Sequence, residues 1–178
     1  MPPHCDTMDG PVVTAARRAL DAEDVKLILP YVQENGEREL KTAFEKALRA
    51  RKSDAAAREV ADLYFFETAV RIHRTGEGAT YTGLKPAGLD VGPVIPVAEK
   101  AIKTGQPEAL VDILTDTLRK EVQHRLEHLQ HLKDYARGDV AKARAYVEAM
   151  LGLEVYSHKL YMAMKSDPHE GSHEHHHG

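Results

Sequence analysis

The chain of 178 residues carries 24 Lys and Arg against 28 Asp and Glu, a formal net charge of −4. This length predicts one domain with a sizeable core, and the acidic balance does not indicate nucleic acid as a partner. One cysteine excludes an internal disulfide framework, and no apolar run approaches the roughly 18 residues needed to cross a bilayer. Met1 is followed by two prolines and no apolar segment, so we expect a cytoplasmic protein without a secretory signal.

Helical patterns follow one another along the chain, and no stretch alternates with period two. The expected helices, several of them marked by a proline or an Asp cap, cover residues 11–29, 36–52, 54–75, 94–104, 107–137 and 140–165. Five of the twelve glycines fall between residues 76 and 93, which predicts one long irregular loop. The predicted fold is all-α, an antiparallel helical bundle with this glycine-rich loop at about 76–93.

The chain is interpreted as three parts. An N-terminal hook covers residues 1–10, a single helical-bundle domain covers 11–165, and a flexible tail covers 166–178. Five of the eleven histidines lie in the tail, which binds divalent metals loosely whatever its origin. The sequence is also compatible with association of copies of the chain into a homo-oligomer.

The hook contains the only cysteine, Cys5, directly after His4. A thiolate and a neutral imidazole are both good ligands for borderline-soft metals, so this pair predicts a metal site. The alternative is a disordered start with a free thiol.

Two further pairs of metal-ligand type lie on the last two helices. His124 and His128 are one turn apart along one margin of an apolar stripe, and the alternative is a half-exposed polar flank. Glu154 and His158, also one turn apart, fall within the predicted buried face of the last helix, where they satisfy each other or a buried Arg, or bind a metal. That predicted face comprises Val140, Ala143, Val147, Met150, Leu151, Val155 and Met162.

The glycine-rich loop and the helix before it form a third candidate site. His73, Glu77, Tyr81 and Lys85 are the candidate catalytic residues, with general acid–base work falling to His73 or Glu77. Long irregular loops in compact domains are often functional. The alternative is an ordered crossover, and the glycine pattern is not a Walker A loop.

Four motifs together resemble an uncharacterised bacterial helical family. They are His-Cys-Asp-Thr-x-Asp-Gly-Pro-Val-Val at 4–13, Phe-Phe-Glu-Thr at 65–68, Arg-Ile-His-Arg at 71–74 and Glu-Gly-x-x-Tyr-x-Gly-Leu-Lys-Pro-Ala-Gly at 77–88. The resemblance covers most of residues 4–165 and brings no established activity. It implies that relatives are often exported, with a signal peptide ending just before the His-Cys-Asp.

Residues 4–10 also resemble the hook of nickel superoxide dismutase, His-Cys-Asp-x-x-Cys-Gly ahead of a four-helix bundle. In that enzyme the N-terminal amine, the histidine, the next cysteine and a second cysteine hold nickel. His4 and Cys5 match, whereas Asp9 stands in the place of the second cysteine. The resemblance implies a transition metal (nickel, copper or iron), but the lost thiolate makes dismutation by the same mechanism doubtful.

Three hypotheses follow. The first is a metal-binding bundle with a redox or metal-handling role, in which the hook folds near His73, the His124/His128 pair or the Glu154/His158 pair. The second is a non-catalytic structural or interaction protein whose polar residues satisfy one another. The third is a metal-free enzyme that binds an unknown small molecule at the loop of residues 67–88.

Overall fold

The structure, a computed structural model, describes residues 3–135 and 139–166. Within these residues the chain forms six α-helices and three short 3-10 helices, and no β-strand. The prediction of an all-α bundle is therefore confirmed. The chain divides into two compact units, Met1–Gly92 (unit 1) and Pro93–Gly178 (unit 2), whereas the sequence was interpreted as one domain over residues 11–165. No helix in the described part of the chain is long and apolar enough to span a membrane.

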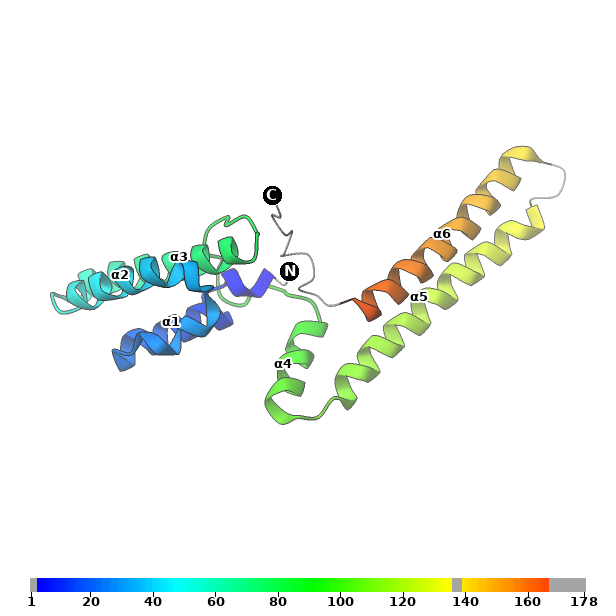
Figure 1. The fold of residues 1–178 in the computed structure, drawn as a ribbon. Helices are drawn as coiled ribbons and strands as arrows, with labels where there is room; N and C mark the ends of the chain where they lie inside the picture. Colours follow the sequence, from blue (N-terminus) through cyan, green and yellow to red (C-terminus); the bar gives the residue numbers. More distant parts are fainter. Residues whose placement is uncertain (1–2, 136–138, 167–178) are drawn as a thin grey trace, which may run out of the picture. The chain divides into compact units, whose positions relative to one another are not determined.

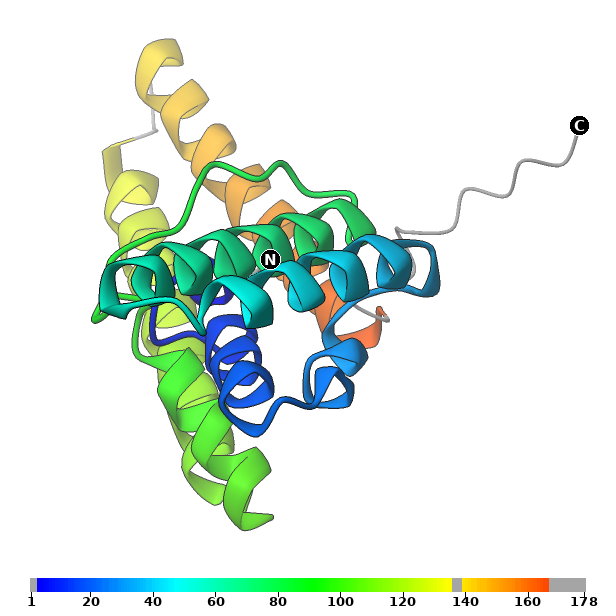
Figure 2. The ribbon, with the colours of Figure 1, turned by 90° about the vertical axis from the view of Figure 1, so that its left-hand side faces the viewer.

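Unit 1 is built from three α-helices, with 3-10 turns between them and a long loop at its end. In chain order its elements are η1 (Pro3–Asp6), α1 (Pro11–Ala22), η2 (Val25–Leu27), η3 (Leu29–Tyr31), α2 (Glu34–Ala50) and α3 (Ala55–Gly76). Helices α2 and α3 lie side by side, and α1 packs against α3 (Figures 1 and 2). Residues 77–93 form no helix or strand, as the glycine content predicted.

Helix α1 is shorter than the predicted helix over residues 11–29. Pro11 occupies its first turn, where the fixed φ of proline suits a helix and no N–H is needed. Glu23 then takes a left-handed conformation (φ 51°), and its N–H donates to carbonyls of the last turn. Left-handed residues terminate helices in this way, so the chain continues to Tyr31 in 3-10 turns instead.

Helices α2 and α3 form the predicted antiparallel hairpin. Asp54 caps α3 as expected, since its side chain accepts the N–H of Ala57 at 2.8 Å. Arg51, in the turn between the helices, pairs with Asp21 of α1 at 2.7 Å and with Asp62 of α3 at 2.8 Å. The Arg51 side chain therefore links α1, α2 and α3 at this end of the unit.

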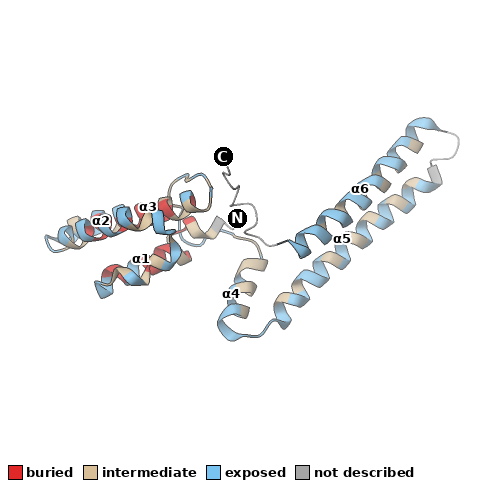
Figure 3. Ribbon diagram, viewed as in Figure 1, coloured by how far each residue is buried: buried red, intermediate tan, exposed pale blue. Residues whose placement is uncertain are grey.

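The hydrophobic core lies among α1, α2 and α3. The rings of Phe44 and Phe65 meet at 5.4 Å between centroids, an arrangement that favours aromatic pairs. The largest fully buried side chains are Phe65, Phe66, Leu20, Ile28, Leu40, Val12, Val13 and Val70. Every described residue that is fully buried belongs to unit 1, as the red segments of Figure 3 show.

Unit 2 contains the helices α4 (Val94–Thr104), α5 (Glu108–Tyr135) and α6 (Val140–Lys165). Gly105 (φ 72°) ends α4, and Asp139 caps α6 by accepting the N–H groups of Ala141 and Lys142. Helices α5 and α6 pack against each other, and the Arg125 guanidinium lies 4.0 Å from the centroid of the Tyr156 ring. The boundaries predicted for α4 and α6 are confirmed.

Most of the predicted buried face of α6 is not buried within unit 2. Helix α6 turns a different face towards α5, formed by the half-buried Ala143, Tyr146, Ala149, Met150, Leu153, Tyr156 and Leu160. Most of the predicted face is exposed, including Val147 (45%), Leu151 (49%) and Val155 (51%). The reason is that α6 is apolar on two sides, and the side with the larger tyrosine and leucine surfaces packs on α5.

Candidate functional site

The hook is a compact turn held by its own backbone. The N–H of Thr7 donates to the carbonyl of His4 at 3.2 Å, and the Thr7 hydroxyl donates to the same oxygen at 2.9 Å. Gly10 closes the turn by donating to the carbonyl of Thr7 at 2.9 Å. A Cβ on Gly10 would lie 1.9 Å from the His4 carbonyl oxygen, so only glycine fits there. The hook is therefore ordered, which excludes the alternative of a disordered start for its described residues.

The hook pairs with the glycine-rich loop. The N–H of Met8 donates to the carbonyl of Lys85 at 3.0 Å, and the N–H of Lys85 donates to the carbonyl of Asp6 at 2.8 Å. The Asp9 carboxylate accepts the N–H of Gly88 at 2.8 Å. This hydrogen bond and a second one from Thr7 lower the pKa of Asp9 below its usual value. Asp9, which stands where the nickel hook has its second cysteine, thus anchors the loop.

A buried ion pair joins the hook to α3. The Arg74 Nε donates to the Asp6 Oδ1 at 2.6 Å, and the two side chains are 5% and 11% exposed. Burial alone would lower the pKa of Arg74, but the hydrogen bond and charge of Asp6, with the charges of Cys5 and Glu77, raise it above its usual value. Asp6 and Arg74 were not selected from the sequence, although both lie in the quoted motifs. The two residues are 68 positions apart, so no local sequence pattern could indicate that they pair.

His73 and Glu77, two of the candidate catalytic residues, lie close together. His73 Nε2 lies 3.3 Å from Glu77 Oε2, and His73 Nδ1 donates to the carbonyl of Tyr31 at 2.7 Å. The same Glu77 oxygen lies 3.5 Å from Arg74. The pair is therefore linked through Arg74 to Asp6 of the hook, and four charged or titratable groups form one network at the end of α3.

Tyr81 and Lys85 have different surroundings. The Tyr81 hydroxyl is buried, and burial raises its pKa above its usual value, as does the charge of Glu67. The Lys85 ammonium instead donates to the Thr82 carbonyl at 3.2 Å, within its own loop.

His4 and Cys5 are half-buried in the hook, and Cys5 packs on the core of unit 1. The structure thus gathers the N-terminal candidates and the loop candidates into one unit. We call residues 4–10 together with 73–88 the hook–loop cluster.

The candidates on α5 and α6 belong to unit 2. Within unit 2, His124, His128, Glu154 and His158 are all exposed, so α5 does not bury the last two as the sequence pattern predicted. Among residues 3–135 and 139–166, no three or more His, Cys, Asp or Glu side chains are grouped so that they could hold a metal ion. The five histidines of the tail, residues 166–178, lie outside the described residues.

The comparisons with known proteins identify a family without an activity. A family model described as "Family of unknown function (DUF6448)" matches residues 9–156. No curated protein and no solved structure matches the chain.

Proposed function

Because the chain belongs to this family of unknown function, we propose its function from the structure: a non-catalytic helical interaction protein whose α6 helix associates with a partner. The observation that carries the proposal is the burial in unit 2. No described residue of unit 2 is fully buried, although its two long helices are rich in apolar residues. An apolar helix face has to be covered for the helix to be stable. A helical pair with so little burial usually needs a further element or a second chain.

The hook–loop cluster supports the same proposal, because most of its polar side chains have partners within unit 1. Asp6 pairs with Arg74, His73 with Glu77, and Asp9 with the backbone of Gly88. Groups that satisfy one another in this way stabilise a fold without requiring a ligand. The cluster then serves to hold the hook and the loop against α3.

Amide hydrogen exchange of the full-length protein tests the association surface. We expect slow exchange along α6 in the wild type and faster exchange in Leu151→Glu, with no change in α1, α2 or α3. Leu151 is 49% exposed in the single chain, so a glutamate there does not disturb the packing of α6 on α5. Equal exchange along α6 in both proteins would show that nothing covers this face and would contradict the proposal.

The adjacent His4 and Cys5 of the hook suggest a second candidate function, which is metal binding with a redox or metal-handling role. His4 and Cys5 offer adjacent nitrogen and sulfur donors, and both are half-buried in the hook. Nickel, copper and iron accept such donors. Two protein ligands make an incomplete set, however, and no third metal ligand is grouped with them among the described residues.

Elemental analysis tests this second candidate. The chain lacking residues 167–178, purified without a metal column, would contain stoichiometric nickel, copper or iron if the hook binds metal. Cys5→Ser would lose that metal, whereas His128→Gln on α5 would keep it. Metal that persists in Cys5→Ser, or no metal in the unaltered chain, would contradict binding at the hook.

A further inference from the structure

Helix α5 carries two exposed histidines one turn apart. His124 and His128 lie within the continuous helix Glu108–Tyr135, and both are exposed within unit 2. Residues four apart lie on the same side of a helix, with Cβ atoms about 5–6 Å from each other. Paired histidines at this spacing on one helix are a known zinc-binding motif. The helix therefore holds the two imidazoles at the spacing that a shared metal ion requires.

The two imidazoles are not used by the fold. Neither histidine forms a hydrogen bond or an ion pair in the part of the chain that the structure describes. The neighbouring Arg125, in contrast, donates to the Glu121 carboxylate at 3.2 Å and lies over a tyrosine ring of α6. A metal ion on His124 and His128 would therefore break no contact on which the packing of α5 against α6 depends.

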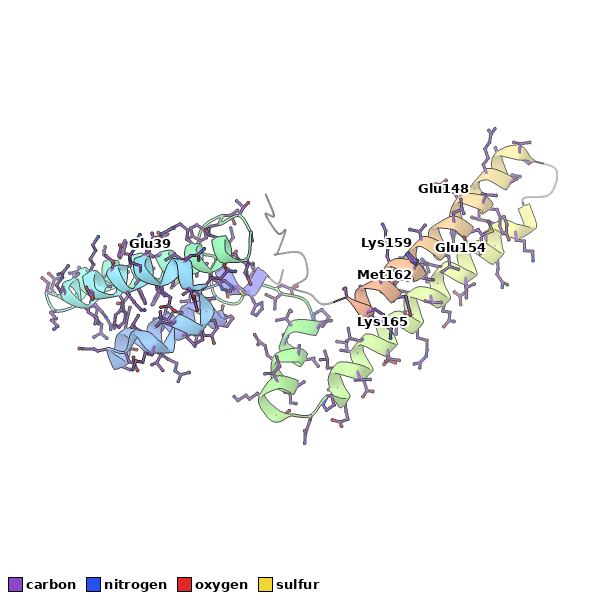
Figure 4. All side chains as sticks on the ribbon, in the orientation of Figure 1. Glu39, Glu148, Glu154, Lys159, Met162 and Lys165 are labelled. Atoms are coloured by element: carbon purple, nitrogen blue, oxygen red, sulfur yellow. The ribbon has the colours of Figure 1, made fainter. Side chains whose placement is uncertain are left out.

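A groove between α5 and α6 reaches one of the two histidines. The groove is lined by His128 and Arg125 from α5 and by Glu148 from α6. Arg125 is already paired with Glu121, whereas Glu148 projects from α6 (Figure 4) and forms no ion pair within the described residues. The charge left over in this groove is negative, and negative charge attracts cations. The groove therefore favours a metal ion beside His128.

We propose that His124 and His128 form a metal site on α5 for a divalent cation that imidazole binds well, namely Cu²⁺, Ni²⁺ or Zn²⁺. A site of two ligands agrees with the finding that no three metal ligands are grouped among the described residues. The remaining coordination positions are left to water, so the metal exchanges with the solution and is lost during purification. The site does not depend on association through α6, and it is separate from the hook, which belongs to unit 1.

Metal binding at this site should stabilise α5. The two imidazoles reach one metal ion only while the helix is formed, so the metal binds the folded helix and not the unfolded chain. Unit 2 buries none of its described residues fully, so the added stability falls where hydrophobic burial is small. Metal at ten times its dissociation constant should make opening of this part of α5 about tenfold rarer.

Amide hydrogen exchange of the full-length protein, with and without Ni²⁺, tests the site. At ten times the dissociation constant measured by titration, we expect amides near His124 and His128 to exchange about tenfold more slowly. His124→Gln and His128→Gln should each abolish this slowing. His158→Gln removes an exposed histidine of α6 and is the matched control, which should keep it. The readout is local to α5, so Ni²⁺ bound by the histidines of the tail does not produce it.

Three outcomes would overturn the site. They are no effect of Ni²⁺ on α5, an effect that survives in both His124→Gln and His128→Gln, and an effect that is lost in Cys5→Ser. The last result would place the metal at the hook. Leu151→Glu should retain the effect of Ni²⁺ on α5 even where it speeds exchange along α6, so failure of the association surface and failure of the metal site are seen separately.

Discussion

Asp6 of the hook and Arg74 of α3 form a buried ion pair, with Arg74 Nε 2.6 Å from Asp6 Oδ1. The pair fixes the hook to the end of α3, 68 positions away in the sequence. It also brings His4 and Cys5 to the end of α3 that carries His73 and Glu77. The ion pair therefore determines the position of the hook relative to α3.

Removal of Arg74 should destabilise unit 1 strongly. Arg74→Met leaves the Asp6 carboxylate buried without its partner, and breaking a buried pair from one side costs about 3–5 kcal/mol. Urea unfolding followed by circular dichroism measures the loss in free energy of unfolding. Arg58→Met is the control, because Arg58 is 58% exposed in its pair with Asp21 and exposed pairs contribute at most about 1 kcal/mol. Similar losses for both variants would contradict a special role for Asp6 and Arg74.

Alanine should have opposite effects at two glycines. At Gly10 the new Cβ would meet the His4 carbonyl oxygen at 1.9 Å, so the hook has to open. We expect Gly10→Ala to cost about 1–3 kcal/mol. At Gly152 in α6 a Cβ would meet nothing within 4 Å, and the helix propensity of alanine should add about 1 kcal/mol of stability. Thermal unfolding measures both shifts, and a stable Gly10→Ala protein would show that the hook can rearrange.

The contact between the hook and the loop should weaken in acid. Hydrogen bonds from Gly88 and Thr7 hold the pKa of Asp9 below its ordinary value of 3.8. A carboxyl group whose pKa is lower in the folded state stabilises the fold above pH 3.8 and loses that effect as the pH falls through its folded value. The urea midpoint of the wild type should therefore fall more between pH 5 and pH 2.5 than that of Asp9→Asn. Equal falls would exclude Asp9 as a source of the pH dependence.

The two units should differ in their ability to fold alone. A chain of residues 1–92 contains the whole buried core, so we expect cooperative unfolding that does not depend on concentration. A chain of residues 93–166 buries no described residue fully, so we expect it to unfold gradually when it is alone. Circular dichroism during thermal unfolding makes the comparison. A cooperative transition of the second chain alone would show that unit 2 needs no further element to cover it.

The sequence predicted most helix boundaries because local chemistry sets them. Asp54 and Asp139 cap the next helix with their own side chains, and Gly105 ends α4 in a left-handed conformation. Glu23 shows the limit of this reasoning. A left-handed glutamate ended α1 seven residues earlier than the end predicted from Pro30, and no sequence pattern marks such a residue.

His73 and Glu77 lie four residues apart, so local geometry brings them together. Asp6 and Arg74 could not, since only the tertiary fold joins the hook to α3. On α6 the periodicity revealed two apolar faces without saying which one α5 covers. The sequence by itself therefore determined the helices and their local pairs, because these depend on neighbours within a turn or two. Tertiary structure decided the buried ion pair, the order of the hook and the face of α6 left exposed, because these depend on packing between distant segments.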